Sequence, residues 1–165
     1  MNKLLYVGPP LATLHDEYAK QRRIDRHAPV TSSSSIDIGA SPSAVWQALV
    51  DVRSWPRWWS GMQVVELGDV RADAPFTWRL NGIAIRSTFA VVDAERELTW
   101  TGRVFGFKAV DRHTVEPAGD RGARVTVEES LAGPFLAVLF PARKLKENHE
   151  KWLTSLKGFV ERQVP

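Results

Sequence analysis

Two residues that can hold or release a proton lie two positions apart in the stretch FGFKAVDRHTVEP, residues 105–117. Alternate side chains of an extended strand point to the same side, so Asp111 and His113 share a face. Their other neighbours on that face are apolar, whereas the opposite face is mostly charged, as a solvated surface requires. This strand therefore carries an aspartate and a histidine where two more hydrophobic residues are expected.

A third titratable residue, Glu129, is predicted to face the same side from the next strand, opposite Asp111 or His113. A histidine with an unperturbed pKa can accept a proton from a carbon next to a carbonyl, while a carboxyl group orients it or returns the proton. If the protein is an enzyme, His113 is expected to be the base and Glu129 the acid or orienting group. Asp111 and Ser87 would then contact a carbonyl or hydroxyl group of the substrate.

The same residues fit two other roles, and the sequence leaves all three open. A carboxylate among apolar side chains is costly unless it is paired or hydrogen-bonded. The cluster could be a structural network, for example with the Trp100 indole donating to Asp111. It could equally anchor the polar groups of a bound molecule.

Hairpin geometry indicates that these residues share one face of a sheet, because a shift of one residue would turn every side chain over. Asn81-Gly82 predicts a two-residue turn, and Phe105-Gly106 is expected to form another. The pairs that follow from the turns are Leu80–Ile83, Val92–Glu97, Val91–Leu98, Phe89–Trp100, Trp100–Asp111 and Leu98–His113. The residues expected to line a ligand site are Trp58, Trp59, Trp78, Ile85, Ser87, Phe89, Trp100, Phe107 and Trp152.

Several further elements must position this face. A strand from Val30 is followed by a helix that Ser41 can cap, and then by a short helical turn in RSWPRWWSGM. Strands are expected at 63–67, 75–80, 83–92, 97–104, 107–116 and 123–131. The tail KLKENHEKWLTSLKGFVERQ predicts a long amphipathic helix with His149 on its apolar side. Residues 1–29 are expected to form an extension, in part helical, and residues 30–165 the domain.

This order of elements resembles the START-like (SRPBCC) superfamily, and specifically its polyketide cyclase/dehydrase-like branch. The stretches that carry the resemblance are SPSAVWQALVDVRSWPRWW, FTWRLNGIAIRSTF, LTWTGRVFGFKAVDRHTVEP, RVTVEESLAG and WLTSLKGFV, within about residues 30–161. The resemblance implies an α+β helix-grip fold, in which a curved antiparallel sheet of about seven strands wraps around the long C-terminal helix. It also implies two short helices after the first strand and a cavity between sheet and helix.

We therefore expect a domain that binds a small or medium hydrophobic, oxygen-bearing molecule, lipid or polyketide-like, in an internal cavity. A cyclase or dehydratase is the first alternative. A regulatory or interaction domain, acting through aromatic rings exposed around Trp55 to Trp59, is the second. The apolar run at 133–141 is expected to be a buried connection at the cavity mouth, with a membrane-docking surface as its alternative.

Composition excludes other classes. The chain has no cysteine, so it has no disulfide framework or thiolate metal site, and its four histidines are expected to lie too far apart for a metal. Net charge is +3 with Lys and Arg scattered among acidic residues, which argues against nucleic-acid binding. No apolar run is long enough to span a membrane. We expect a cytoplasmic protein without a cofactor, either a monomer or a homodimer.

Overall fold

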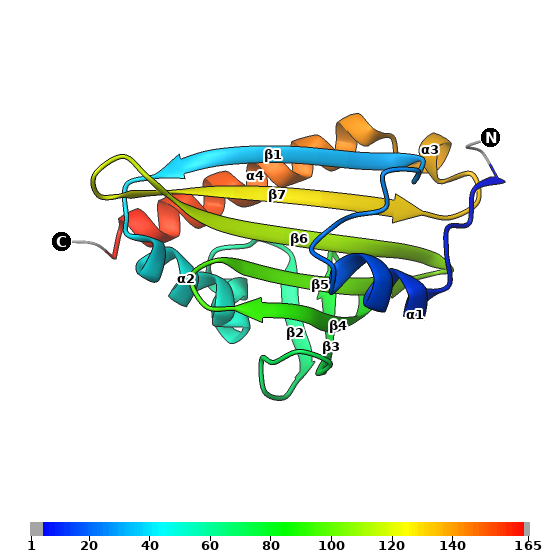
Figure 1. Ribbon diagram of the computed structural model, residues 1–165, viewed down its shortest axis with the longest axis horizontal. Helices are drawn as coiled ribbons and strands as arrows, with labels where there is room; N and C mark the ends of the chain where they lie inside the picture. The colour runs from blue at the N-terminus through cyan, green and yellow to red at the C-terminus, as the bar shows by residue number, and fades with distance from the viewer. Residues whose placement is uncertain (1–4, 164–165) are drawn as a thin grey trace.

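Seven antiparallel strands form one curved sheet in the order β1-β7-β6-β5-β4-β3-β2 (Figure 1). The computed structural model describes residues 5–163. The strands are β1 (Val30–Ile38), β2 (Met62–Leu67), β3 (Pro75–Leu80), β4 (Ile83–Asp93), β5 (Glu97–Val104), β6 (Phe107–Ala118) and β7 (Gly122–Ala132). The helical segments are α1 (Leu11–Thr13), η2 (Leu14–Ala19), α2 (Pro42–Val50), η3 (Val52–Arg57), α3 (Leu136–Leu139) and α4 (Ala142–Glu161).

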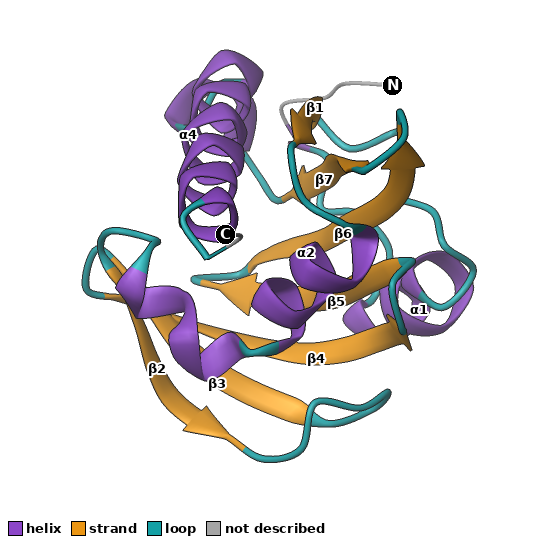
Figure 2. Cartoon of the chain, turned by 90° about the vertical axis from the view of Figure 1, so that its left-hand side faces the viewer, coloured by secondary structure: helices purple, strands orange, loops and turns teal. Residues whose placement is uncertain are grey.

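The long helix α4 and the shorter α2 lie on the concave, inner side of the sheet (Figure 2). Helix α2 begins as predicted, because the Ser41 hydroxyl accepts a hydrogen bond from the Ala44 amide at 3.2 Å. The buried side chains of α4 form a stripe at helical spacing, which includes Leu145, His149 and Trp152. The predicted helix-grip architecture is therefore confirmed.

The strand registers agree with the turn chemistry over most of the sheet. Asn81 and Gly82 both have positive φ, 50° and 82°, as the predicted tight turn between β3 and β4 requires. Trp100 pairs with Asp111, as predicted. In the next hairpin Asp111 pairs with Glu129, which settles the partner that the sequence left open.

The predicted pairing of β4 with β5 is wrong near the turn that joins these two strands. The β4–β5 pairing shifts by one residue between Phe89 and Val91, so that Val92, not Val91, lies opposite Leu98. The extra residue, Ala90, forms a bulge, which turns the following side chain to the other face. Val91 therefore belongs to the outer face of the sheet.

The N-terminal segment covers part of that outer face, on the side opposite α4 (Figure 1). Leu14, Ala19 and Ile24 pack against Ala90 and Val110 of the sheet in a small apolar cluster. The outer face was expected to be open to water, yet its Thr99, Thr101 and Ser130 are buried. That expectation is wrong because residues 5–29 cover part of the outer face and exclude water from it.

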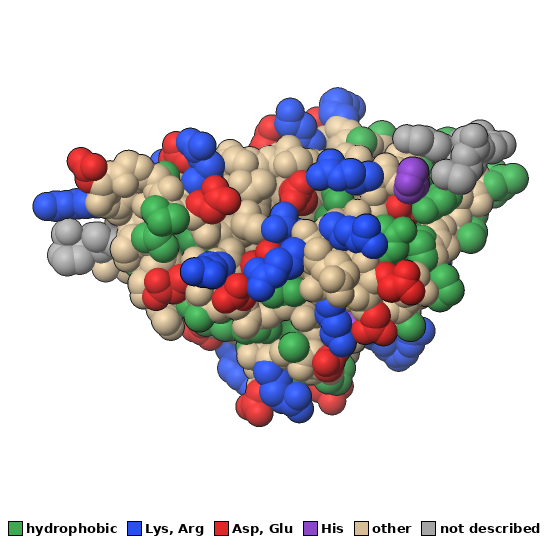
Figure 3. All heavy atoms as spheres, in the orientation of Figure 1, with side chains coloured by type: hydrophobic (Ala, Val, Ile, Leu, Met, Phe, Trp, Pro, Cys, Tyr) green, Lys and Arg blue, Asp and Glu red, His purple; other side chains and the backbone are tan. Residues whose placement is uncertain are grey.

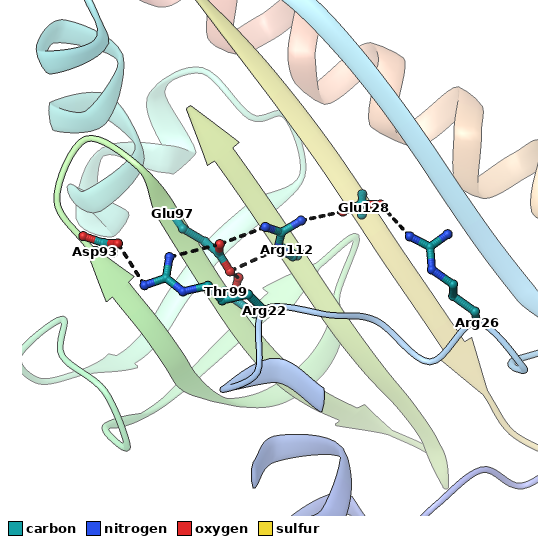
Figure 4. Close-up of polar contacts among 7 residues, drawn as sticks. All are labelled: Arg22, Arg26, Asp93, Glu97, Thr99, Arg112 and Glu128. Carbon is teal, nitrogen blue, oxygen red and sulfur yellow. Dashed lines mark hydrogen bonds and ion pairs between the residues drawn. The ribbon is translucent and has the colours of Figure 1, made fainter. Parts of the chain in front are cut away.

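Ion pairs and hydrogen bonds of charged side chains join the N-terminal segment to the sheet (Figure 4). The buried Glu97 accepts hydrogen bonds from Arg112 at 3.1 and 3.0 Å and from the Thr99 hydroxyl at 2.8 Å. From the segment, Arg22 reaches the same carboxylate at 3.4 Å. Arg112 extends the network by donating to Glu128 at 2.7 Å. The N-terminal segment is thus held by ion pairs as well as by apolar contacts.

A second group of hydrogen bonds holds the same segment. Tyr6 donates to the buried Asp25 at 2.8 Å, and burial together with that carboxylate raises the pKa of Tyr6 to about 12. The Asp25 amide in turn donates to the Ser130 hydroxyl on β7 at 3.1 Å. Within η2, His15 lies 2.9 Å from the Thr101 hydroxyl and 3.0 Å from Asp73.

Candidate functional site

Four titratable side chains lie on the inner side of the sheet under α4. Asp111 and His113 come from β6, Glu129 from β7 and His149 from α4. Nε2 of His149 lies 2.9 Å from Oε2 of Glu129, within hydrogen-bond distance. Nδ1 of His113 lies 3.7 Å from Oδ1 of Asp111, which is too long for a hydrogen bond. We call these four residues the inner polar cluster.

Side-chain alternation in the paired strands and helical spacing on α4 together place the residues of the inner polar cluster near one another. Because Asp111 and Glu129 are paired across β6 and β7, their side chains project from the same face. On α4, His149 lies four residues after Leu145 and three before Trp152, so all three side chains face the sheet. The cluster therefore joins the sheet to the helix that the sheet grips.

Burial favours the uncharged forms of Asp111 and His113 on β6. It raises the pKa of Asp111 well above its usual range, and the nearby charge of Glu129 raises it further. It lowers the pKa of His113 to about 3, with His149 contributing to the shift and a hydrogen bond to the Leu98 backbone opposing it. Both shifts favour the uncharged forms, so Asp111 and His113 are a neutral contact and not an ion pair.

The inner polar cluster contains several atoms without a hydrogen-bond partner among the described residues. They are Oδ1 of Asp111, Nδ1 of His113 and Nδ1 of His149. On β1, the hydroxyls of Ser32 and Ser34 are also buried without a partner, and Ser32 pairs with Glu129 in the register. Each such group costs about 1–3 kcal/mol. This part of the interior is therefore polar and unsatisfied.

Aromatic rings form the wall next to the cluster. The His113 ring stacks on Trp100, with centroids 4.6 Å apart and planes at 18°, and lies 4.7 Å from Trp152. Trp152 meets Trp58 edge to face at 5.4 Å. A molecule that contacted the polar cluster would therefore also contact these indoles.

In this structure the aromatic rings occupy much of the space between the sheet and α4. Trp55 and Trp58 are buried and Trp59 is half-buried, so these rings form no exposed patch of the kind that an interaction domain would show. A surface hollow of about 420 Å³ lies elsewhere, at the edge formed by Asp37, Glu116 and Arg124. The sequence did not indicate that the indoles fill so much of the interior.

The structure brings together most of the residues predicted to line a ligand site. Trp58, Trp59, Trp78, Trp100 and Trp152 belong to one connected group of rings.

The other predicted residues are more dispersed. Ile85 packs at the margin of the main core, and the Ser87 hydroxyl accepts a hydrogen bond from the Trp78 indole at 3.1 Å. The Phe89 ring stacks on Phe76. Phe107 packs in a separate cluster with Val30, Leu136 and Leu145. Ser87 and Phe107 are therefore not part of the inner polar cluster.

His149 is the residue that the sequence analysis missed. It was noted only as part of the α4 stripe, and its distance from His113 was expected to be large. The structure corrects that expectation, since His149 lies close enough to affect the pKa of His113. The signal was present in the sequence, because a histidine between Leu145 and Trp152 interrupts an otherwise apolar stripe. Among residues 5–163, no group of three or more His, Asp or Glu side chains is arranged to hold a metal ion.

The curved sheet, the gripped helix and the buried polar cluster between them define a START-like helix-grip domain. The chain belongs to the family described as polyketide cyclase / dehydrase and lipid transport, whose model matches residues 29–161. No curated protein matches the chain. Within residues 5–163, none of the helices combines the length and apolar character needed to cross a membrane.

Solved structures share the fold at low sequence identity. A Chromobacterium violaceum protein has a TM-score of 0.69 and 17% identity, covering 81% of this chain and 98% of its own. A START superfamily protein from Mycobacterium smegmatis has a TM-score of 0.65 and 15% identity, covering 81% and 99%. A norcoclaurine synthase from Thalictrum, in complex with a transition-state analogue, has a TM-score of 0.65 and 14% identity, covering 81% and 94%. At these identities the likeness concerns the fold alone.

Proposed function

We propose that the protein binds a small or medium apolar molecule with one or more oxygen functions, lipid or polyketide-like, between the sheet and α4. The observation that carries the proposal is the set of unpartnered polar atoms in the inner polar cluster, on Asp111, His113 and His149. Native proteins satisfy most buried polar groups, so such a set calls for a further partner. Membership of a family described by cyclisation, dehydration and lipid transport supports the same conclusion.

The chemistry of the cluster specifies which groups it can recognise. A protonated Asp111 donates a hydrogen bond, so it suits a carbonyl or ether oxygen. Neutral His113 can donate or accept through Nδ1, depending on the tautomer, and Nδ1 of His149 is also without a partner among the described residues. Since Trp100 and Trp152 adjoin His113, the remainder of the ligand is expected to be apolar or aromatic.

Binding requires the packed indoles to make room for the ligand. Trp58 and Trp59 follow η3, a short 3-10 segment that contains Pro56 and therefore lacks one backbone donor. Helix α4, by contrast, has twenty residues and is tied to β7 through His149 and Glu129. We therefore propose that η3 and the two indoles after it move to admit the ligand, while α4 stays in place.

Native mass spectrometry tests the proposal. The wild-type protein is expected to carry a copurified compound at 1:1 stoichiometry, or to take up a fatty acid or a hydroxylated anthraquinone after delipidation. His149→Phe should reduce that uptake, because it removes both ring nitrogens while keeping a ring on α4. The matched control is His27→Phe, at an exposed position outside the core. Equal uptake by wild type and His149→Phe, or no uptake by the wild type, would contradict the proposed site.

A second candidate function rests on the 2.9 Å contact between His149 and Glu129. In a cyclase or dehydratase, this pair would remove the proton from a carbon next to a carbonyl, while Asp111 donates a hydrogen bond to the carbonyl oxygen. The expected base thus changes from His113 to His149, because a pKa of about 3 makes His113 a weak base. Exchange of solvent deuterium into a bound ketone, lost in Glu129→Gln and retained in His113→Phe, would support catalysis. Retention of exchange in Glu129→Gln would argue against it.

A further inference from the structure

One end of the molecule exposes several large apolar side chains. Phe105 is 82% exposed, Val138 69%, Leu139 66% and Phe135 55%. Phe105 lies in the β5–β6 turn, and the other three lie in or just before α3. We call these four residues the apolar end. Figure 3 shows hydrophobic side chains gathered on the right-hand side of the molecule, where Figure 1 places α3.

Three segments that are distant in sequence meet at this end. Gly133 lies directly against the Phe107 ring, and a Cβ at this position would overlap it. The Gly133 amide also donates to the Tyr6 carbonyl at 3.2 Å. The β5–β6 turn, the α3 segment and the N-terminal segment are therefore neighbours, and exposed Leu5 and Val7 flank Tyr6.

The two exposed phenylalanines have a backbone conformation that bulky residues rarely adopt. Phe105 has φ of 49° and Phe135 has φ of 57°, both in the left-handed region. A non-glycine residue there is strained, and such strain concentrates at functional sites. Phe105 and Gly106, with φ of 49° and 83°, form a two-residue turn that requires this geometry. The side chains of Phe105 and Phe135 are both left exposed.

Basic residues outnumber acidic residues in the two sequence stretches that form the apolar end. No Asp or Glu occurs at 98–110 or at 130–146, whereas these stretches contain Arg103, Lys108, Arg143, Lys144 and Lys146. Two of these cations pair with acidic residues further along α4, at Glu147 and Glu150, and Lys108 donates to the backbone carbonyls of Gly8 and Pro9. Lys144 lies over the Phe140 ring, with Nζ 5.3 Å from its centroid, next to α3. The end therefore combines exposed apolar side chains with an excess of positive charge.

We propose that the apolar end docks on the surface of a membrane containing anionic phospholipid. Phe105, Phe135 and Leu139 would enter the boundary between headgroups and acyl chains, and nearby cations would contact phosphate groups. Positive charge favours this partner over a second copy of the chain, because a two-fold contact through the same patch would bring like charges together. The proposal does not depend on the ligand site under α4.

Vesicle sedimentation tests the docking surface on the full chain. Wild-type protein is expected to sediment with phosphatidylglycerol–phosphatidylcholine vesicles and much less with phosphatidylcholine alone, with binding weakened by salt. The triple substitution F105S/V138S/L139S should lower the partition coefficient about tenfold or more, because it removes the inserting groups. The matched control is V65S/I83S, two exposed apolar residues outside the apolar end, which should bind as the wild type does.

A second variant separates docking from folding defects. Lys144→Glu keeps all apolar residues and reverses one exposed charge, so it should weaken binding to anionic vesicles without changing the circular dichroism spectrum. The proposal is overturned if the wild type ignores anionic vesicles, or if V65S/I83S lowers binding as much as the triple substitution does. It is also overturned if the wild type is a dimer that F105S/V138S/L139S converts to a monomer while vesicle binding is unchanged.

Discussion

His149 on α4 and Glu129 on β7 are joined by a contact of 2.9 Å between Nε2 and Oε2. This contact crosses the interior of the fold and links the gripped helix to the strand next to β1. It also fixes the part of α4 from which Trp152 projects toward His113. The position of the aromatic wall and that of the polar cluster are therefore coupled through one pair of residues.

Replacing Glu129 by Gln should lower the free energy of unfolding by about 1–3 kcal/mol, because the substitution weakens a mostly buried hydrogen bond to His149. Urea unfolding followed by tryptophan fluorescence would measure the change. Glu150→Gln on the exposed side of α4 is the matched control, with an expected effect of about 0.5 kcal/mol or less. Equal effects of the two substitutions would show that the contact does not stabilise the fold.

The low pKa of His113 predicts that stability falls as the solution is acidified. Between pH 6.5 and about 3 the unfolded chain binds a proton at this residue and the folded chain does not, so protonation favours unfolding. The loss is at most about 1.4 kcal/mol per pH unit from this residue. His113→Phe should reduce the slope of stability against pH in that window, measured by urea unfolding at several pH values. An unchanged slope would mean that His113 is not buried in its neutral form.

The raised pKa of Asp111 predicts the opposite dependence of stability on pH. This raised pKa means that the folded chain retains a proton that the unfolded chain loses above about pH 4, so the contribution of Asp111 to stability declines as pH rises from there. Asp111→Asn removes this titration with little change in shape. Its stability relative to the wild type should therefore increase from pH 4 toward pH 8, as judged by paired denaturation curves. A relative stability that decreases over that interval would contradict the assigned direction.

On the outer face, Glu97→Gln should cost about 1–3 kcal/mol, because it weakens the hydrogen bonds that the buried Glu97 accepts from Arg112, although Arg112 keeps Glu128 (Figure 4). The comparison is Asp37→Asn, which breaks the exposed pair with Arg124 and should have a much smaller effect, because water screens exposed ion pairs. Thermal unfolding of both variants would measure the difference. If Glu97→Gln proves as mild as Asp37→Asn, the network does not hold the N-terminal segment.

Turn chemistry and alternation made much of the sheet predictable. Asn81-Gly82 fixed one hairpin, and the β5–β6 turn placed Asp111 opposite Trp100 as observed. The bulge at Ala90 was not predictable, because no residue type there demands an extra position in the strand. The register error remained confined to the few residues between the bulge and the next turn.

Contacts between segments distant in sequence were the least predictable. Periodicity placed His149 on the apolar side of α4, but the partner across the interior depends on how α4 lies on the sheet. The outer face was expected to be solvated for the same reason. Nothing in the sequence of β5 or β6 indicates that residues 5–29 cover Thr99 and Thr101. The filling of the interior by indoles likewise depends on packing among η3, α4 and the sheet, not on any one segment.

A crystal structure of the protein with its copurified or supplied ligand tests the central claim most directly. We predict density between the sheet and α4, with a ligand oxygen within hydrogen-bond distance of Asp111 Oδ1, His113 Nδ1 or His149 Nδ1, and with Trp58 and Trp59 displaced. Density confined to the surface hollow beside Asp37 and Arg124, with the indoles unmoved, would contradict it.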